Sequence, residues 1–146
     1  SSLMLYNNVG SQVFTLTSTL RDSGGFDEKL EMWQDLELWI RLARAGVQFQ
    51  RIPECTYHMD VAHGDARISD KKSEIKLGAC EYISLKHQLN REEKIQLLSQ
   101  FYSDHPDEMS LRYVLSLLFS GWQRPVAYKV MKLIYRKAYF SMKAER

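Results

Sequence analysis

The sequence has few cysteines, no long apolar run and little net charge. Its two cysteines, Cys55 and Cys80, are too few for a disulfide framework or a zinc site, so we expect a reduced, intracellular setting. The densest apolar stretch, residues 114–119, is six residues long, far below the roughly 18 that a membrane-spanning helix needs. A net charge of +2 is too small to indicate nucleic-acid binding by itself.

What is present indicates one globular domain's worth of chain. Hydrophobic residues make up 45% and charged residues 26% of the 146 residues, as in soluble proteins. The chain begins at Ser1 without an initiator Met or a signal-type segment, so we expect either a processed protein or a piece of a longer one, and the motifs below favour the piece. Charge is unevenly spread: residues 121–146 hold seven basic residues and one acid, a net of +6, which leaves −4 for the rest.

The first third of the chain predicts a mixture of strands and helices. A strand is expected over Gln12–Leu16, and Thr17 or Ser18 is expected to cap a brief helix through Arg21. Apolar residues at spacings of three and four predict a helix over Asp35–Ala45, which Gly46 ends. Alternation of apolar and polar residues then predicts a strand over Val47–Ile52.

The remainder predicts about four helices. Asp70–Leu89 is the first, and the residues expected inside it are Ile75, Leu77, Ala79, Tyr82, Ile83 and Leu85. Asn90 with Glu93 predicts a capping box for the second, Asp107 opens the third and Pro125 lies in the first turn of the fourth. We therefore expect a helix-rich α+β fold, with a short sheet backed by the Asp35 helix and a C-terminal helical bundle.

Residues near the first long helix have two interpretations each. Asp35 fits a helix N-cap, and it also fits a catalytic carboxylate held rigidly beside Trp33 and Trp39. Gly24 and Gly25 fit an ordinary turn, or a loop whose backbone approaches a substrate closely. Trp33 fits a buried core position, or a ring that stacks on a sugar.

These landmarks together resemble a known family. In order they are Gly24-Gly25-Phe26-Asp27-Glu28, Gln34-Asp35, Leu38-Trp39-Ile40-Arg41-Leu42, Gly46 and Pro53-Glu54. The segment from about Asn8 to Ser69 is similar to the family 2 glycosyltransferases of the GT-A fold, whereas later residues match no family. The resemblance implies an inverting sugar transfer from a nucleotide-sugar donor, with Asp35 as general base. It implies substrate-binding roles for Gly24, Gly25, Trp33 and Gln34, although Gln34 replaces the family's usual Glu.

The resemblance also implies a divalent metal, Mg²⁺ or Mn²⁺, in the intact enzyme. His63 is the expected metal-contacting residue, with His58 as the alternative, and the competing interpretation is a solvated loop with surface histidines. The sequence has no Asp-x-Asp motif, so the N-terminal nucleotide-binding half is expected to be missing and this piece to be inactive and metal-free by itself. Residues 1–69 would form the acceptor-side part, and 70–146 a helical extension.

The basic segment Pro125–Ala144 predicts an amphipathic helix. It fits a peripheral contact with an anionic membrane, or a final packing helix with a solvated lysine face. The expected partners are a nucleotide-sugar donor and a glycan or lipid-linked acceptor, without nucleic acid, in the cytoplasm or at the inner face of the membrane. The alternative function is a non-catalytic helical module that docks a partner protein or a membrane. Unpaired strand edges predict that the fragment self-associates.

Overall fold

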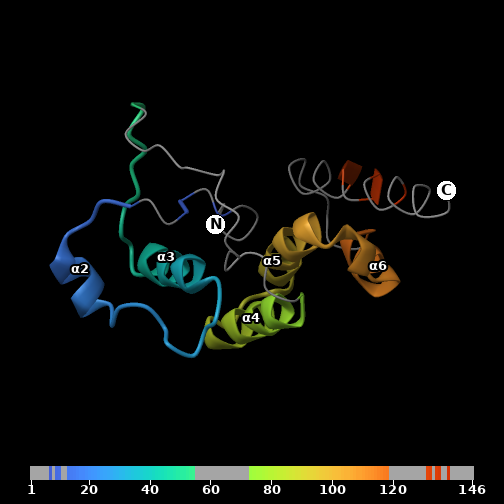
Figure 1. Ribbon diagram of the computed structural model, residues 1–146, viewed down its shortest axis with the longest axis horizontal. Helices are drawn as coiled ribbons and strands as arrows, with labels where there is room; N and C mark the ends of the chain where they lie inside the picture. Colours follow the sequence, from blue (N-terminus) through green and yellow to red (C-terminus); the bar gives the residue numbers. More distant parts are fainter. Residues whose placement is uncertain are drawn as a thin grey trace, which may run out of the picture.

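The computed structural model describes residues 7, 9–10, 13–54 and 73–118, together with positions 131–132, 134–135 and 138. This part of the chain is rich in helix, as the sequence predicts (Figure 1). The elements are the α-helices α2 (Thr17–Asp22), α3 (Gln34–Arg44), α4 (Ser73–Lys86), α5 (Arg91–Asp104) and α6 (Leu111–Leu118), and the 3-10 helix η2 (Pro106–Glu108).

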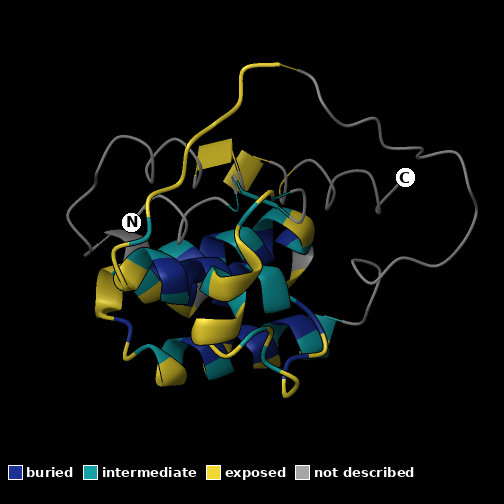
Figure 2. Ribbon diagram, turned by 90° about the vertical axis from the view of Figure 1, so that its left-hand side faces the viewer, coloured by how far each residue is buried: buried dark blue, intermediate teal, exposed yellow. Residues whose placement is uncertain are grey.

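The core forms where α3 meets the α4 and α5 helices. In Figure 1, α3 lies between α2 and the α4–α5 pair, and in Figure 2 the buried residues gather on the facing sides of the helices. One cluster of buried apolar residues draws on all three helices; its fully buried members include Leu36, Leu38, Ile40, Ile83, Leu97 and Phe101. Residues from both predicted parts of the chain therefore share this core.

Local signals place the helix ends where the sequence predicts them. Asn90 and Glu93 form a capping box, in which each side chain accepts from the other residue's backbone N–H, at 2.9 and 3.0 Å. Gly46, with φ 86°, follows α3 in a Schellman motif closed by the Val47 N–H on the Leu42 carbonyl at 3.0 Å. Gln88, with φ 47°, plays the same part after α4, which ends at Lys86 rather than at the predicted Leu89.

Three helical details differ from the sequence prediction. Leu85 is 76% exposed instead of buried, because α4 buries the stripe of Lys76, Ala79, Cys80 and Ile83 and Leu85 lies on the other side. The short helix α2 has no side-chain cap from Thr17 or Ser18, since Leu16 is its N-cap residue. The third predicted helix begins at Leu111 rather than Asp107, and the Ser110 Oγ accepts from the Tyr113 N–H at 3.1 Å.

The two predicted strands do not form in the residues that the structure describes. Residues 13–16 and 47–52 lie outside any strand, and in the described ranges no strand is present beside them. A strand exists only through hydrogen bonds to a neighbouring strand, so strand-forming side chains alone do not create one. Apolar side chains on these segments are consequently exposed: Phe14, Leu16, Phe49 and Ile52. Figure 2 shows residues 48–54 leaving the helices as an exposed segment.

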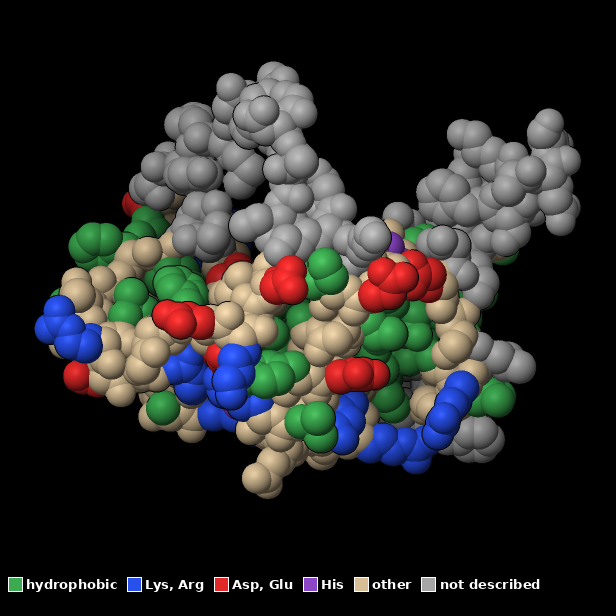
Figure 3. All heavy atoms as spheres, turned by 60° about the horizontal axis from the view of Figure 1, so that its bottom comes forward, with side chains coloured by type: hydrophobic (Ala, Val, Ile, Leu, Met, Phe, Trp, Pro, Cys, Tyr) green, Lys and Arg blue, Asp and Glu red, His purple; other side chains and the backbone are tan. Residues whose placement is uncertain are grey.

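On the face seen in Figure 3, acidic, basic and apolar side chains are all exposed, and the basic ones lie mostly along its lower part. Pro125 and most of the basic segment lie outside the described residues; positions 131–132, 134–135 and 138 are helical. Met131, Ile134 and Tyr135 are exposed there. Within the part of the chain that the structure describes, no helix is long and apolar enough to cross a membrane.

Two glycine-to-alanine substitutions are expected to act in opposite directions. Gly78 lies inside α4 with open space around its Cα, so Gly78→Ala should raise the free energy of unfolding by about 0.5–1 kcal/mol. Gly46 also has open space, but its φ of 86° is unfavourable for alanine, so Gly46→Ala should lower it by about 1 kcal/mol. Urea unfolding of both variants measures this, and equal signs would contradict the assigned backbone conformations.

Candidate functional site

Asp35 lies in the first turn of α3 and is half-buried. It is not the helix N-cap, because that position belongs to Trp33, whose side chain makes no capping hydrogen bond. The Asp35 carboxylate accepts from the Leu36 N–H at 2.7 Å through Oδ1, and from the Asn7 side-chain amide at 3.4 Å through Oδ2. One carboxylate, partly open to solvent, is thus fixed in orientation at the positive end of a helix.

Trp33 and Gln34 form the turn that leads into α3. Trp33 has φ 60° and ψ 23°, a left-handed conformation that is rare for a bulky residue. Its ring is half-buried, with the Lys76 ammonium 5.7 Å from the ring centroid. The Gln34 Nε2 donates to the Leu30 carbonyl at 2.8 Å. A Glu at position 34 would have no such donor, so Gln34 itself supports the local turn.

The Gly24–Gly25 loop is attached to the middle of α3 by Arg41. The guanidinium donates to the carbonyls of Ser23 and Gly25, the latter at 2.6 Å. Both glycines have positive φ, 85° and 68°, a conformation that favours glycine. Arg41 lies six residues after Asp35, about 9 Å along the helix axis, so the loop is tied to the same rigid element rather than to the carboxylate itself.

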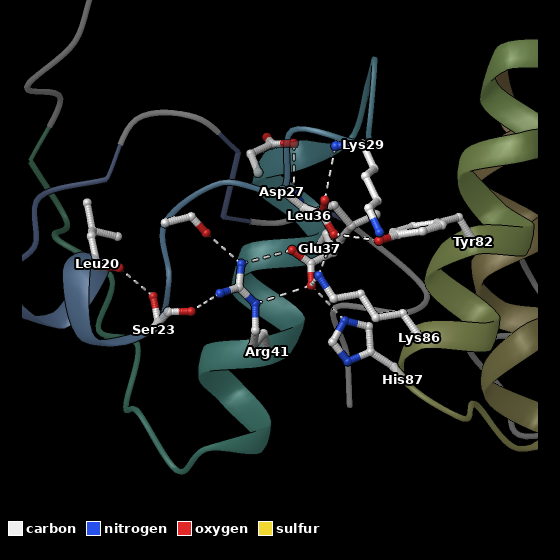
Figure 4. Close-up of polar contacts among 12 residues, drawn as sticks. Leu20, Ser23, Asp27, Lys29, Leu36, Glu37, Arg41, Tyr82, Lys86 and His87 are labelled. Carbon is white, nitrogen blue, oxygen red and sulfur yellow. Dashed lines mark hydrogen bonds and ion pairs between the residues drawn. The ribbon is translucent and has the colours of Figure 1, made fainter.

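A buried carboxylate, Glu37, anchors this arrangement (Figure 4). Its side chain is 0% exposed and has three cationic or imidazole neighbours: Arg41 Nη2 at 3.0 Å, Lys86 Nζ at 2.9 Å and His87 Nε2 at 2.9 Å. Burial alone would raise the pKa of Glu37, but the hydrogen bonds from His87, Arg41 and Lys86 outweigh it and lower the pKa to about 2. The group is therefore an anion at neutral pH.

Asp27 extends these contacts to the glycine loop. The Lys86 Nζ, which also contacts Glu37, lies 2.5 Å from the Asp27 Oδ2, and the Tyr82 hydroxyl donates to the same oxygen at 2.8 Å. The hydrogen bond from Lys86 is the main reason that the pKa of Asp27 falls to about 2. Figure 4 shows these side chains converging from α3, α4 and the loop. We name the set Asp27, Glu37, Arg41, Tyr82, Lys86 and His87 the Glu37 network.

The predicted site residues are only partly brought together. Trp33, Gln34 and Asp35 adjoin one another at the start of α3, whereas Gly24 and Gly25 contact Arg41 further along it. His63 and His58 lie outside the described residues. Within the described ranges, no group of three or more His, Cys, Asp or Glu side chains is placed to hold a metal ion.

The sequence prediction missed the Glu37 network. One signal was available, since Glu37 interrupts the buried run Leu36–Ile40 and Arg41 follows it at the four-residue spacing of a helical ion pair. Lys86 and His87 join from about 50 residues away, which no local pattern indicates. No protein-family model matches the chain, and no curated protein or solved structure matches it either.

Removing the buried charge should destabilise the protein strongly. Glu37→Gln keeps the side-chain shape but leaves Arg41 and Lys86 without their shared anion, so we expect a loss of about 3–5 kcal/mol in the free energy of unfolding. The exposed acid of α4, Glu81, provides the matched control: Glu81→Gln should stay within about 0.5 kcal/mol. Urea unfolding at pH 7 measures both, and equal stabilities would contradict the role given to Glu37.

Stability should also fall at acidic pH. The pKa of Glu37 is about 2 in the folded chain against its ordinary value of 4.5, so the unfolded state binds the proton first as the pH falls. The contribution is complete above pH 4.5 and is lost as the pH falls towards 2, amounting to about 3 kcal/mol at most. Urea midpoints between pH 2 and 7 should show a shallower decline in Glu37→Gln than in the wild type.

Proposed function

We propose that this chain is the acceptor-side part of an inverting family 2 glycosyltransferase, with Asp35 as its general base. The observation that carries the proposal is the placement of the resembling motifs on one helix. Asp35 lies in the first turn of α3, and Arg41 of the Leu-Trp-x-Arg-Leu motif donates to the Ser23 and Gly25 carbonyls of the glycine loop. Motifs that are separated in the sequence thus form one connected unit.

The chemistry asks for a carboxylate on a stiff element, within hydrogen-bonding reach of an acceptor hydroxyl. Asp35 would accept the hydroxyl proton while the hydroxyl oxygen forms a bond to the anomeric carbon of the donor sugar. The bond from that carbon to the nucleotide diphosphate breaks on the opposite face. Asp35 is half-buried and its two oxygens are oriented by Leu36 and Asn7, which supports this role.

The finer fold also belongs to this proposal. In a GT-A domain the segments 13–16 and 47–52 would be short strands completed by the nucleotide-binding half. Their exposed apolar side chains, Phe14, Leu16, Phe49 and Ile52, support such an assignment. The residues proposed to contact Mg²⁺ or Mn²⁺, His63 or else His58, lie outside the described residues, so no step is assigned through a metal here.

A second candidate is a non-catalytic module that docks a membrane or a partner protein through its basic C-terminal segment. The observation that favours it is the exposure of Met131 (59%), Ile134 (38%) and Tyr135 (72%) next to the exposed Lys132. Apolar side chains beside a lysine on one helical segment suit an anionic lipid surface. In this alternative Asp35 only orients the first turn of α3.

The test uses the complete gene product, assayed with a panel of nucleotide sugars, Mn²⁺ and a crude glycan or lipid acceptor extract. Asp35→Asn should lower turnover by about 100- to 10,000-fold, because the side chain can no longer accept a proton as a base. Donor affinity should be unchanged, because Asn has nearly the same side-chain shape as Asp. The exposed Asp22 at the end of α2 gives the control variant Asp22→Asn, which should keep wild-type turnover.

Two results would overturn the proposal. Turnover that survives Asp35→Asn would leave Asp35 with a structural role only. A wild-type protein that turns over no donor but binds anionic vesicles would reject the glycosyltransferase and favour the membrane-docking function.

A further inference from the structure

Lys76 is a buried cation whose partners lie around the start of α3. It belongs to the first half of α4 and is 3% exposed. Its Nζ pairs with the Asp104 carboxylate at the end of α5 and lies 5.7 Å from the centroid of the Trp33 ring. A buried ammonium group needs such partners, because without them its removal from water is uncompensated. The Trp33 ring is thus one of the contacts on which the charge depends.

Trp33 holds the unusual backbone conformation from which α3 begins. Its φ of 60° is strained for a residue with a Cβ, and such strain persists only where the surroundings fix it. The Trp33 carbonyl accepts the first hydrogen bond of the helix, from the Glu37 N–H at 2.9 Å. Rotation of φ to the ordinary extended region would redirect the Cα–Cβ bond and carry the ring off Lys76. Contact with Lys76 therefore opposes that rotation.

Asp35 follows Trp33 by two residues, so the direction of its side chain depends on how the helix begins. The Asp35 side chain is also linked to α5. The Gln100 Oε1 on α5 accepts from the Asn7 backbone N–H at 3.1 Å, and the Asn7 side chain donates to the Asp35 carboxylate at 3.4 Å. From the part of the chain that resembles no family, α5 thus reaches the carboxylate through Asn7, and α4 contacts Trp33, two residues before Asp35.

We propose that Lys76 is a positioning residue, which holds the Asp35 carboxylate in its reactive orientation by fixing Trp33 from the opposite helix. The catalytic meaning of this positioning rests on the proposed function, whereas the positioning itself does not. The helices after residue 72 are then part of the working site and not only a scaffold attached to it.

The first measurement is made on the 146-residue chain without substrate. The Leu36 amide proton, which donates to the Asp35 Oδ1, and the Trp33 indole N–H report the local geometry in a ¹H–¹⁵N spectrum. Lys76→Met keeps the length and apolar stem but removes the charge, and it should shift both signals. Lys76→Arg keeps the charge and should shift them less. Lys94→Met, at an exposed lysine of α5, is the matched control and should leave both signals in place.

The second measurement is turnover by the complete gene product carrying the same variants. Lys76→Met should lower kcat by about 10- to 100-fold with KM for the donor unchanged, as expected for a misplaced catalytic group. Lys76→Arg should recover part of kcat, and Lys94→Met all of it. A change in KM alone, or an equal loss in Lys76→Arg and Lys76→Met, would indicate a structural role and overturn the proposal.

The two proposals fail separately. Unmoved Leu36 and Trp33 signals in Lys76→Met would overturn the positioning role, whatever the activity. Moved signals together with a wild-type protein that turns over no donor would keep the positioning role and reject the glycosyltransferase. If Lys76→Met does not fold, Lys76→Gln replaces it, because Gln removes the charge but keeps a polar end. The Leu36 and Trp33 signals and the turnover of Lys76→Gln are then compared with those of Lys76→Arg, and the same results decide between the proposals.

Discussion

The carboxylate of Glu37, fully buried in the core, is the constraint on which the other contacts depend. An anion without partners in that position would cost far more than a domain of this size has in net stability. Arg41, one turn later on α3, supplies one cation, and Lys86 and His87 at the end of α4 complete the set. The end of α4 is therefore fixed beside the first half of α3.

That constraint determines where the rest of α4 lies. Lys76 precedes Lys86 by ten residues, about 15 Å along the helix, and lies beside Trp33 and Asp104. Arg41 uses its remaining donors on the Ser23 and Gly25 carbonyls, so the same guanidinium that neutralises Glu37 also holds the glycine loop. The end of α4 and the glycine loop are therefore both held by side chains that contact Glu37, whereas Lys76 near the start of α4 pairs with Asp104.

Buried ion pairs are poor evidence for extra stability, because well-packed apolar side chains in their place often give an equal free energy of unfolding. Their distinctive effect here is geometric. Apolar packing between α3 and α4 through Leu36, Ile40 and Ile83 is compatible with small sliding or rotation, whereas the contacts at 2.9–3.0 Å to Glu37 are not. A site that needs one carboxylate in a fixed orientation benefits from a core of this kind.

The sequence predicts the local parts of the fold well and the long-range parts poorly. The Asn90–Glu93 capping box and the Gly46 helix end are visible because all their atoms lie within a few residues. The strands expected over 12–16 and 47–52 do not form in the described part, because strand formation depends on a neighbouring strand and not on the segment alone. The pattern places Asp35 on the correct helix, but the N-cap is Trp33, two residues before it, and not Asp35.

The contacts that decide the site's geometry join residues about 40 to 90 positions apart, and no spacing rule connects them. The motif-bearing segment and the helices that resemble no family consequently depend on each other. Without α4, Glu37 would keep only Arg41, and Trp33 would lose the contact that favours its left-handed backbone. The motif residues locate the carboxylate in the sequence, whereas α4 and α5 contact Trp33 and Asn7, the residues before Asp35 and beside its side chain. Any account of Asp35, catalytic or not, must therefore include residues that the landmarks do not contain.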